Sequence, residues 1–260
     1  RWSGEDATVI GLRTALSDRA TMYVEQRLMH PRDGTRWIPA TVVGSEERWG
    51  DGGRSYGEYQ TGSGQNGTFN RAVLGIGRRF ELTNGFYGDV AFERMHTEVV
   101  DGIGTARDAN VLSLGGEYVG NPDLKVSSRF EVRHESSDRD RLQLLSLNRL
   151  SASLGRGVSL FGRVDIMTTQ DLLNDTREAE AMNFSLGLAY RPLDDSVTLL
   201  VKAARIVDMR PASLDPEAGS LRVTADVVSI EPIIELPLRL QLTPKFAYRR
   251  MVEEAEGIPA

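Results

Sequence analysis

The 260-residue sequence predicts an all-β protein whose strands run up and down beside one another in an antiparallel sheet. Apolar and polar residues alternate with a period of two over many segments, while helical periodicity is hard to find. Several of these segments reach ten or more residues, although strands in soluble sheets usually have about five or six. Residues typical of hairpin turns separate them.

The alternation is clearest in the segment 182–190. Because successive side chains of a strand point to opposite faces, one face of this segment carries only apolar residues. These are Met182, Phe184, Leu186, Leu188 and Tyr190. The segments 124–132 and 238–248 repeat the pattern with charged residues on the opposite face. We therefore expect long strands with one apolar and one polar face.

Counting segments of this kind gives about fourteen strands. The predicted spans are 6–16, 20–29, 40–48, 54–61, 70–82, 85–99, 108–119, 124–135, 141–154, 158–169, 179–192, 197–207, 221–236 and 238–250. A tilted strand needs about nine to eleven residues to cross a bilayer. The lengths therefore favour an antiparallel up-and-down transmembrane β-barrel over a soluble sheet.

The joins between the predicted strands alternate in length. Tight joins follow the odd-numbered strands, at 17–19, 49–53, 83–85, 120–123, 155–157, 193–196 and Pro237. Longer polar joins follow the even-numbered strands, at 30–39, 62–69, 100–107, 136–140, 170–178 and 208–220. Outer-membrane barrels have short periplasmic turns and longer external loops. A sandwich or a propeller gives no reason for such an asymmetry.

This alternation places both ends of the chain on the outer side. A complete bacterial barrel normally begins and ends in the periplasm, and residues 257–260 lack the aromatic strand end expected there. We therefore expect the chain to be one barrel domain, 1–260, that is a segment of a longer polypeptide. The full barrel would have sixteen or more strands.

Several classes of function find no support in the sequence. A transmembrane helix is excluded because there is no apolar run of about 20 residues. The absence of cysteine removes disulfides, thiolate metal sites and cysteine nucleophiles. With a net charge of −6 and no basic stripe, nucleic acid is not an expected partner. His30, His96 and His134 lack metal-ligand spacing, and no nucleophile–base set indicates an enzyme, so we predict no catalytic residue, metal or cofactor.

The polar faces of the strands carry the candidate functional residues. If the apolar faces meet lipid, these charged side chains line the interior, because burying them in hydrocarbon costs several kcal/mol each. The candidates are Arg13, Glu25, Arg27, Glu93, Glu117, Arg129, Glu131, Arg133, Arg163, Asp165, Lys202, Arg239, Lys245 and Arg249. They are expected either to tune passage through a water-filled lumen or to form cross-strand ion pairs that only solvate it.

Aromatic residues lie near several predicted strand ends, where interfacial girdles occur in membrane barrels. They are Trp37, Trp49, Phe80, Phe86, Tyr87, Tyr190 and Tyr248. Aromatic residues are also common at the strand ends of soluble sheets, so the placement adds modest weight to the membrane interpretation.

Several stretches share one style of strand and turn. They are Asn84–Tyr87, Ala91–Arg94, Ser113–Tyr118, Phe130–His134 and Ser185–Asp194. In this style the chain resembles the C-terminal β-barrel region of large proteobacterial outer-membrane surface proteins. The resemblance implies an outer-membrane location in a Gram-negative bacterium and supplies no catalytic residue.

Two functions follow from this reading. The first is a pore or translocation channel with a charged lumen. The second is a structural anchor that holds surface domains or partner proteins without transport. Outer-membrane lipid and lipopolysaccharide are the expected surroundings, and other envelope proteins or further domains of the same chain are expected partners. A soluble β-rich carbohydrate-binding protein is the alternative to the membrane interpretation as a whole.

Overall fold

A computed structural model describes residues 6–30, 38–64, 67–101, 105–192, 197–211, 220–236 and 240–256. The described residues form 15 β-strands and no helix. The strands are β1 (Asp6–Ala15), β2 (Ala20–His30), β3 (Ile38–Trp49), β4 (Gly53–Gly64), β5 (Gly67–Thr83), β6 (Phe86–Asp101), β7 (Arg107–Asn121), β8 (Leu124–Ser136), β9 (Asp140–Gly155), β10 (Val158–Asp171), β11 (Thr176–Tyr190), β12 (Val197–Pro211), β13 (Ser220–Leu236), β14 (Leu240–Leu242) and β15 (Phe246–Glu256).

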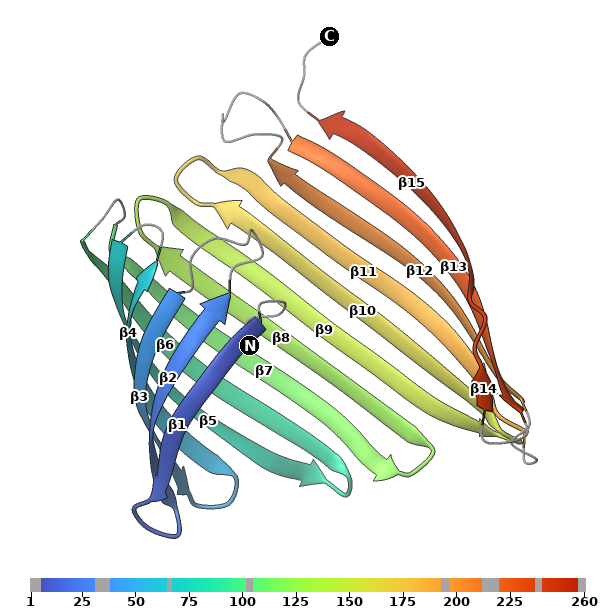
Figure 1. The fold of residues 1–260 in the computed structure, drawn as a ribbon, viewed down its shortest axis with the longest axis horizontal. Coiled ribbons are helices and arrows are strands. Elements are labelled where there is room, and N and C mark those ends of the chain that lie inside the picture. Colours follow the sequence, from blue (N-terminus) through green and yellow to red (C-terminus); the bar gives the residue numbers. More distant parts are fainter. Residues whose placement is uncertain are drawn as a thin grey trace. The chain divides into compact units, whose positions relative to one another are not determined.

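The strands form one antiparallel sheet in which each strand from β1 to β13 is hydrogen-bonded to the next along the chain (Figure 1). β14 and β15 both pair with β13. The prediction of an all-β, up-and-down antiparallel sheet is therefore confirmed. The strand order is open, so the sheet does not establish a closed barrel. Among the described residues, no helix has the length and apolarity needed to cross a lipid bilayer.

The predicted strand positions agree with the structure, with one interruption. The last predicted strand, 238–250, is divided into β14 and β15 by residues 243–245. Pro244 lies in this break and has no backbone N–H to donate to the ladder. After the break the chain pairs with β13 again and continues to Glu256.

The difference in length between the long and the short joins is smaller in the structure than the sequence predicts. β4 reaches Gly64 and β5 begins at Gly67, and these two residues pair, so the long join predicted at 62–69 is wrong. Only residues 137–139 separate β8 from β9, and only 172–175 separate β10 from β11. Backbone pairing continues through glycine, serine and charged residues that give no apolar signal. The joins 31–37, 193–196, 212–219 and 237–239 lie outside the described residues.

Tight turns lie where Asn-Gly and Gly-rich sequences predict them. Gly85, in the turn between β5 and β6, has φ +74°. Between β9 and β10, Arg156 and Gly157 have φ +52° and +77°. Positive φ at both central residues is the type I′ requirement, which matches the twist of the strands on either side.

The chain divides into two compact units. The first comprises Arg1–Phe80, Asp89–Ser113 and Arg133–Arg141. The second comprises Glu81–Gly88, Leu114–Val132 and Leu142–Ala260.

In the first unit, strand register separates a polar face from an apolar face. On the apolar face, Leu12 pairs with Val24, and Val24 pairs with Val43. On the polar face, Glu25 pairs with Val42 and Arg27 with Ala40. A slip of one residue would exchange the two faces, so the apolar pattern fixes this register.

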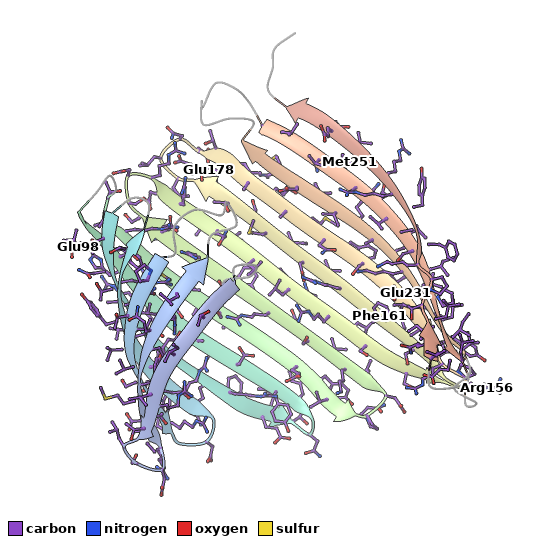
Figure 2. All side chains as sticks on the ribbon, viewed as in Figure 1. Glu98, Arg156, Phe161, Glu178, Glu231 and Met251 are labelled. Carbon is purple, nitrogen blue, oxygen red and sulfur yellow. The ribbon has the colours of Figure 1, made fainter. Side chains whose placement is uncertain are left out.

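The second unit shows the same division in β10–β13. Leu188 of β11 lies opposite Leu160 and Val201, and together they belong to the apolar face. Arg163 of β10 lies opposite Ser185 on the polar face. Side chains from both faces are drawn in Figure 2.

The burial of the two faces is the reverse of that in a soluble sheet. Large apolar side chains are exposed, including Leu12 at 83% and Leu186 at 45%. Polar residues on the other face are buried, including Glu135 at 6% and Ser185 at 6%. An apolar surface of this extent marks a region that another apolar phase or a partner covers.

Candidate functional site

A tyrosine, a glycine and a glutamate on three neighbouring strands form a motif that occurs twice on the polar face of the first compact unit. Tyr23 of β2 lies opposite Gly44 of β3, which lies opposite Glu58 of β4. The Tyr23 hydroxyl crosses β3 and donates a hydrogen bond of 2.8 Å to the Glu58 carboxylate. A Cβ at Gly44 would lie within 2.8 Å of Tyr23 Cε2 and closer still to Cζ. The glycine therefore provides the space through which the ring passes.

The same arrangement recurs two strands further along. Tyr56 of β4 lies opposite Gly75 of β5 and donates a hydrogen bond to Glu93 of β6. A Cβ at Gly75 would meet the ring of Tyr56. A ring placed over a cross-strand glycine covers backbone and helps to fix register. These two tyrosine–glycine–glutamate motifs connect β2 to β4 and β4 to β6.

Cations adjoin these carboxylates. Arg27 Nη2 lies 2.8 Å from Glu25 and 3.5 Å from Glu58. The Arg13 guanidinium lies over the Tyr23 ring, 5.2 Å from its centroid. Arg71 of β5 interacts electrostatically with Glu58 and Glu93.

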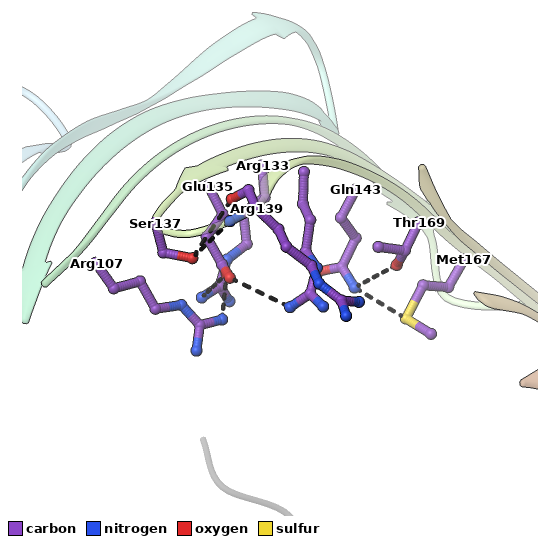
Figure 3. A network of polar contacts seen from close by, with 9 residues as sticks. Arg107, Arg133, Glu135, Ser137, Arg139, Gln143, Met167 and Thr169 are labelled. Carbon is purple, nitrogen blue, oxygen red and sulfur yellow. Dashed lines mark hydrogen bonds and ion pairs between the residues drawn. The ribbon is translucent and has the colours of Figure 1, made fainter. Parts of the chain in front are cut away.

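Among the described residues of the first unit, the most buried charge is that of Glu135 near the end of β8, whose side chain is 8% exposed. Three arginines contact it: Arg107 of β7 and Arg133 of β8, which Figure 3 labels, and Arg141 of β9. Arg107 donates a hydrogen bond to Glu135 Oε2. Arg133 Nη2 lies 3.3 Å from the same oxygen, and Arg141 Nη1 lies 3.8 Å from Oε1. We call these four residues the arginine cluster.

In the second unit the polar face carries a third aromatic residue over glycine. Phe161 of β10 lies opposite Gly187 of β11, and a Cβ at Gly187 would meet the Phe161 ring. Gly187 in turn lies opposite Lys202 of β12. Nearby on β10, Arg163 and Asp165 form an ion pair.

The polar face of the second unit also holds neutral polar contacts. Gln143 of β9 donates a hydrogen bond of 3.2 Å to Thr169 of β10 and lies 3.3 Å from Met167 Sδ (Figure 3). These contacts link β9 to β10 through side chains as well as through the backbone.

The structure brings many of the sequence-predicted residues into ion pairs, and three of these pairs lie within one strand. Glu25–Arg27, Arg129–Glu131 and Arg163–Asp165 each join residues two apart on one strand. Arg27 also lies 3.5 Å from Glu58 of β4, so contacts between strands occur among the candidates as well. Residues two apart share a face of a strand, and an arginine is long enough to turn back to its neighbour.

The other candidates have varied surroundings. Lys245 Nζ lies 3.7 Å from Glu231, and Lys202 lies opposite Gly187 and Ser229. Arg249 donates to Met251 Sδ at 3.5 Å, and Glu117 lies on β7 between Gly116 and Tyr118. Arg239 lies outside the described residues, as does the predicted girdle residue Trp37.

Sequence reasoning missed several residues that define the site: Tyr23, Glu58, Tyr56, Arg71, Arg107, Glu135 and Arg141. Glu135 extends the series Glu131, Arg133 by one more period of two, which was a usable signal. Arg107 and Arg141 lie on the strands on either side of Glu135, and the sequence alone does not give the register that places them beside it.

The apolar face of the second unit also carries charged residues, including a row across β12, β13 and β15. Arg205 of β12 lies opposite Asp226 of β13, which lies opposite Arg250 of β15. Arg205 binds Asp226 through two hydrogen bonds of 2.8 and 3.1 Å. This fork arrangement satisfies both carboxylate oxygens.

His96 and His134 each form a pair with a carboxylate. His96 Nδ1 lies 3.0 Å from Asp108, and His134 Nε2 lies 2.7 Å from Asp140. His134 is 44% exposed, and the His30 side chain lies outside the described set. Within the described ranges, no group of three or more histidine or carboxylate side chains is placed to hold a metal ion.

Comparison with protein-family models and with curated proteins gives no match to this chain.

Proposed function

We propose that the chain forms the wall of an outer-membrane β-barrel that works as a pore, with the apolar face against lipid and the polar face toward an aqueous lumen. One observation supports this proposal most directly. Apolar side chains are exposed on one face, whereas charged and polar side chains are partly or wholly buried on the other. Membrane barrels show this inverted pattern because lipid replaces the second packing layer of a soluble protein.

Strand length supports the same proposal. β5–β13 have 13 to 17 residues each, more than the nine to eleven that a tilted strand needs to cross the hydrocarbon core. The surplus would extend each strand beyond the bilayer at one or both rims. Trp49 and Phe86, at strand ends next to tight turns, and Tyr190, at the end of β11, would then lie near membrane interfaces.

The polar face would provide the chemistry of the lumen. Acidic and basic side chains alternate over it, and their pairing with neighbours keeps them fixed at a wet surface. In a barrel of fourteen or more strands, the interior is wide enough to hold water or a plug. Ions and small polar solutes are the cargo that such a surface suits.

Reconstitution of the purified protein into planar bilayers tests this function. We expect stepwise single-channel openings with a linear current–voltage relation. Protein that is folded into the membrane, as shown by resistance of its strands to protease, but carries no current would reject the pore.

A specific observation favours the alternative of an anchor without transport. On the polar face of the first unit, Val42 is 0% and Ala40 is 1% exposed, so longer neighbouring side chains cover them. A lumen filled by its own side chains would not conduct. Silent but membrane-inserted protein in the same bilayer experiment would support this alternative.

A further inference from the structure

The row of charges on the apolar face of the second unit lies where the exposed apolar surface of β12 ends. On one side of Arg205 the apolar face is exposed: Leu186 and Val228, which both lie opposite Ala203, are 45% and 48% exposed. On the other side, toward the end of β12, Val207 and Met209 belong to the same face but are only 7% and 5% exposed. Met209 lies between Glu180 and Arg222, whose longer side chains can cover it. The surface suited to hydrocarbon therefore stops at the level of Arg205.

Strand length places the row at one edge of a membrane crossing. Residues 197–204 of β12 precede Arg205, and residues 227–236 of β13 follow Asp226. Because β12 and β13 are antiparallel, both segments run from the row toward the same end of the sheet. A tilted strand crosses the hydrocarbon core in about nine to eleven residues. The row is therefore about one crossing away from that end, at the level of lipid head groups, where a charge costs least.

The row presents two guanidinium groups on either side of one carboxylate. Arg205 donates to both oxygens of Asp226, from Nε at 2.8 Å and from Nη2 at 3.1 Å. Arg250 lies opposite Asp226 on the neighbouring strand and interacts with it electrostatically. Arg205 and Asp226 are exposed, so the row is accessible from the apolar face. Planar guanidinium groups bind phosphate oxygens in a bidentate manner.

We propose that the row of Arg205, Asp226 and Arg250 binds the phosphate of an anionic lipid in the outer leaflet, such as the glycolipid of lipopolysaccharide. The proposal rests on the proposed membrane wall, in which the join predicted at 208–220 is external. The acyl chains would lie along the exposed apolar side chains of β11–β13, and the phosphate would lie at the level of the guanidinium groups. Free phosphate has no acyl chain to cover this apolar surface, so the surface favours the lipid.

Native mass spectrometry of the full chain in detergent, titrated with the phosphorylated glycolipid lipid A, tests the site. We expect saturable binding that Arg250→Gln weakens by about fivefold or more, because the variant removes one planar donor group. The matched control is Arg249→Gln, which changes the same residue type at the next position on the opposite face, where Arg249 donates to Met251. Its binding should equal that of the wild type.

A conservative variant and two further ligands sharpen the test. Arg250→Lys keeps the charge and loses the fork, so its binding should be intermediate. Dephosphorylated lipid A should bind more weakly than lipid A. Inorganic phosphate, measured by isothermal titration, should bind more weakly still. Insertion of every variant into vesicles is checked by protease resistance, so that a folding defect is not taken for a loss of binding.

The outcomes separate the site from the pore. Equal weakening by Arg249→Gln and Arg250→Gln in inserted protein would overturn the site, as would binding of dephosphorylated lipid A or inorganic phosphate as tight as that of lipid A. Inserted protein that is silent in bilayers but still distinguishes Arg250→Gln from Arg249→Gln would reject the pore and keep the site. Wild-type protein that does not insert into vesicles would overturn both.

Discussion

Replacement of Gly44 by alanine tests whether the aromatic residues on the polar face hold neighbouring strands in register. The added Cβ would lie within 2.8 Å of Tyr23 Cε2, so the ring must move. That movement breaks the hydrogen bond from Tyr23 to Glu58 and the contact of Arg13 with the ring. Gly57 is the matched control, because its nearest neighbour for a new Cβ is the flexible end of Leu74, at 3.3 Å.

The expected loss follows from the interactions that break. A hydrogen bond to a charged acceptor contributes about 1.5–3 kcal/mol, and partial exposure of this pair reduces that to about 1–2 kcal/mol. The exposed cation–π contact adds about 0.5 kcal/mol. Glycine to alanine lowers the entropy of the unfolded chain and returns about 0.4–1 kcal/mol. Gly44→Ala should therefore destabilise by about 1 kcal/mol or more, whereas Gly57→Ala should be neutral or stabilising.

Equilibrium urea unfolding in detergent or lipid vesicles, followed by fluorescence of the three tryptophans, measures both variants. In the double variant Tyr23→Phe/Gly44→Ala, the loss should be smaller than the sum of the single losses, because both changes remove the same hydrogen bond. Equal stabilities of Gly44→Ala and Gly57→Ala would refute the proposed role of the ring.

Three further variants test other parts of the structure. Tyr56→Phe removes the donor to Glu93 and should lower the free energy of unfolding by about 1–2 kcal/mol in the same urea assay, with Tyr59→Phe on the opposite face as an unaffected control. Glu135→Gln removes the carboxylate that Arg107, Arg133 and Arg141 contact and should lower the free energy of unfolding by roughly 2 kcal/mol in the same assay; a variant as stable as the wild type would contradict the cluster's energetics. Asp226→Asn leaves Arg205 and Arg250 without the carboxylate between them on the apolar face. It should reduce the protease-resistant fraction after folding into vesicles more than the double variant Arg205→Ala/Asp226→Ala does. A larger reduction in the double variant would show that this row does not face lipid.

Most of the fold could be predicted from sequence because period-two patterning is a local property. The segment around Leu186 carries its apolar face at every second position, and the structure keeps that pattern. The strand ends could not be placed in the same way. Gly64 and Gly67 pair although neither carries a side chain to reveal it. Pro244 interrupts the last strand, whereas Pro232 is accommodated within β13 opposite Leu199.

The site was less predictable because it depends on which strands meet. Arg133 was expected on the polar face, but its partner Glu135 is surrounded from β7 and β9 as well as from β8. Tyr23 and Tyr56 were missed because a tyrosine reaches two strands away only where glycine intervenes. That condition becomes visible only when register is known.

A cysteine scan along β11 tests the central claim, that the apolar face meets lipid and the polar face meets water. The chain has no native cysteine, so each single variant reports one position. Spin labels at Phe184, Leu186 and Leu188 should be relaxed by membrane-dissolved oxygen, and labels at Asn183, Ser185 and Ala189 by a water-soluble nickel complex. A clear period of two is the predicted result. Equal access of the nickel complex to both sets would contradict the account.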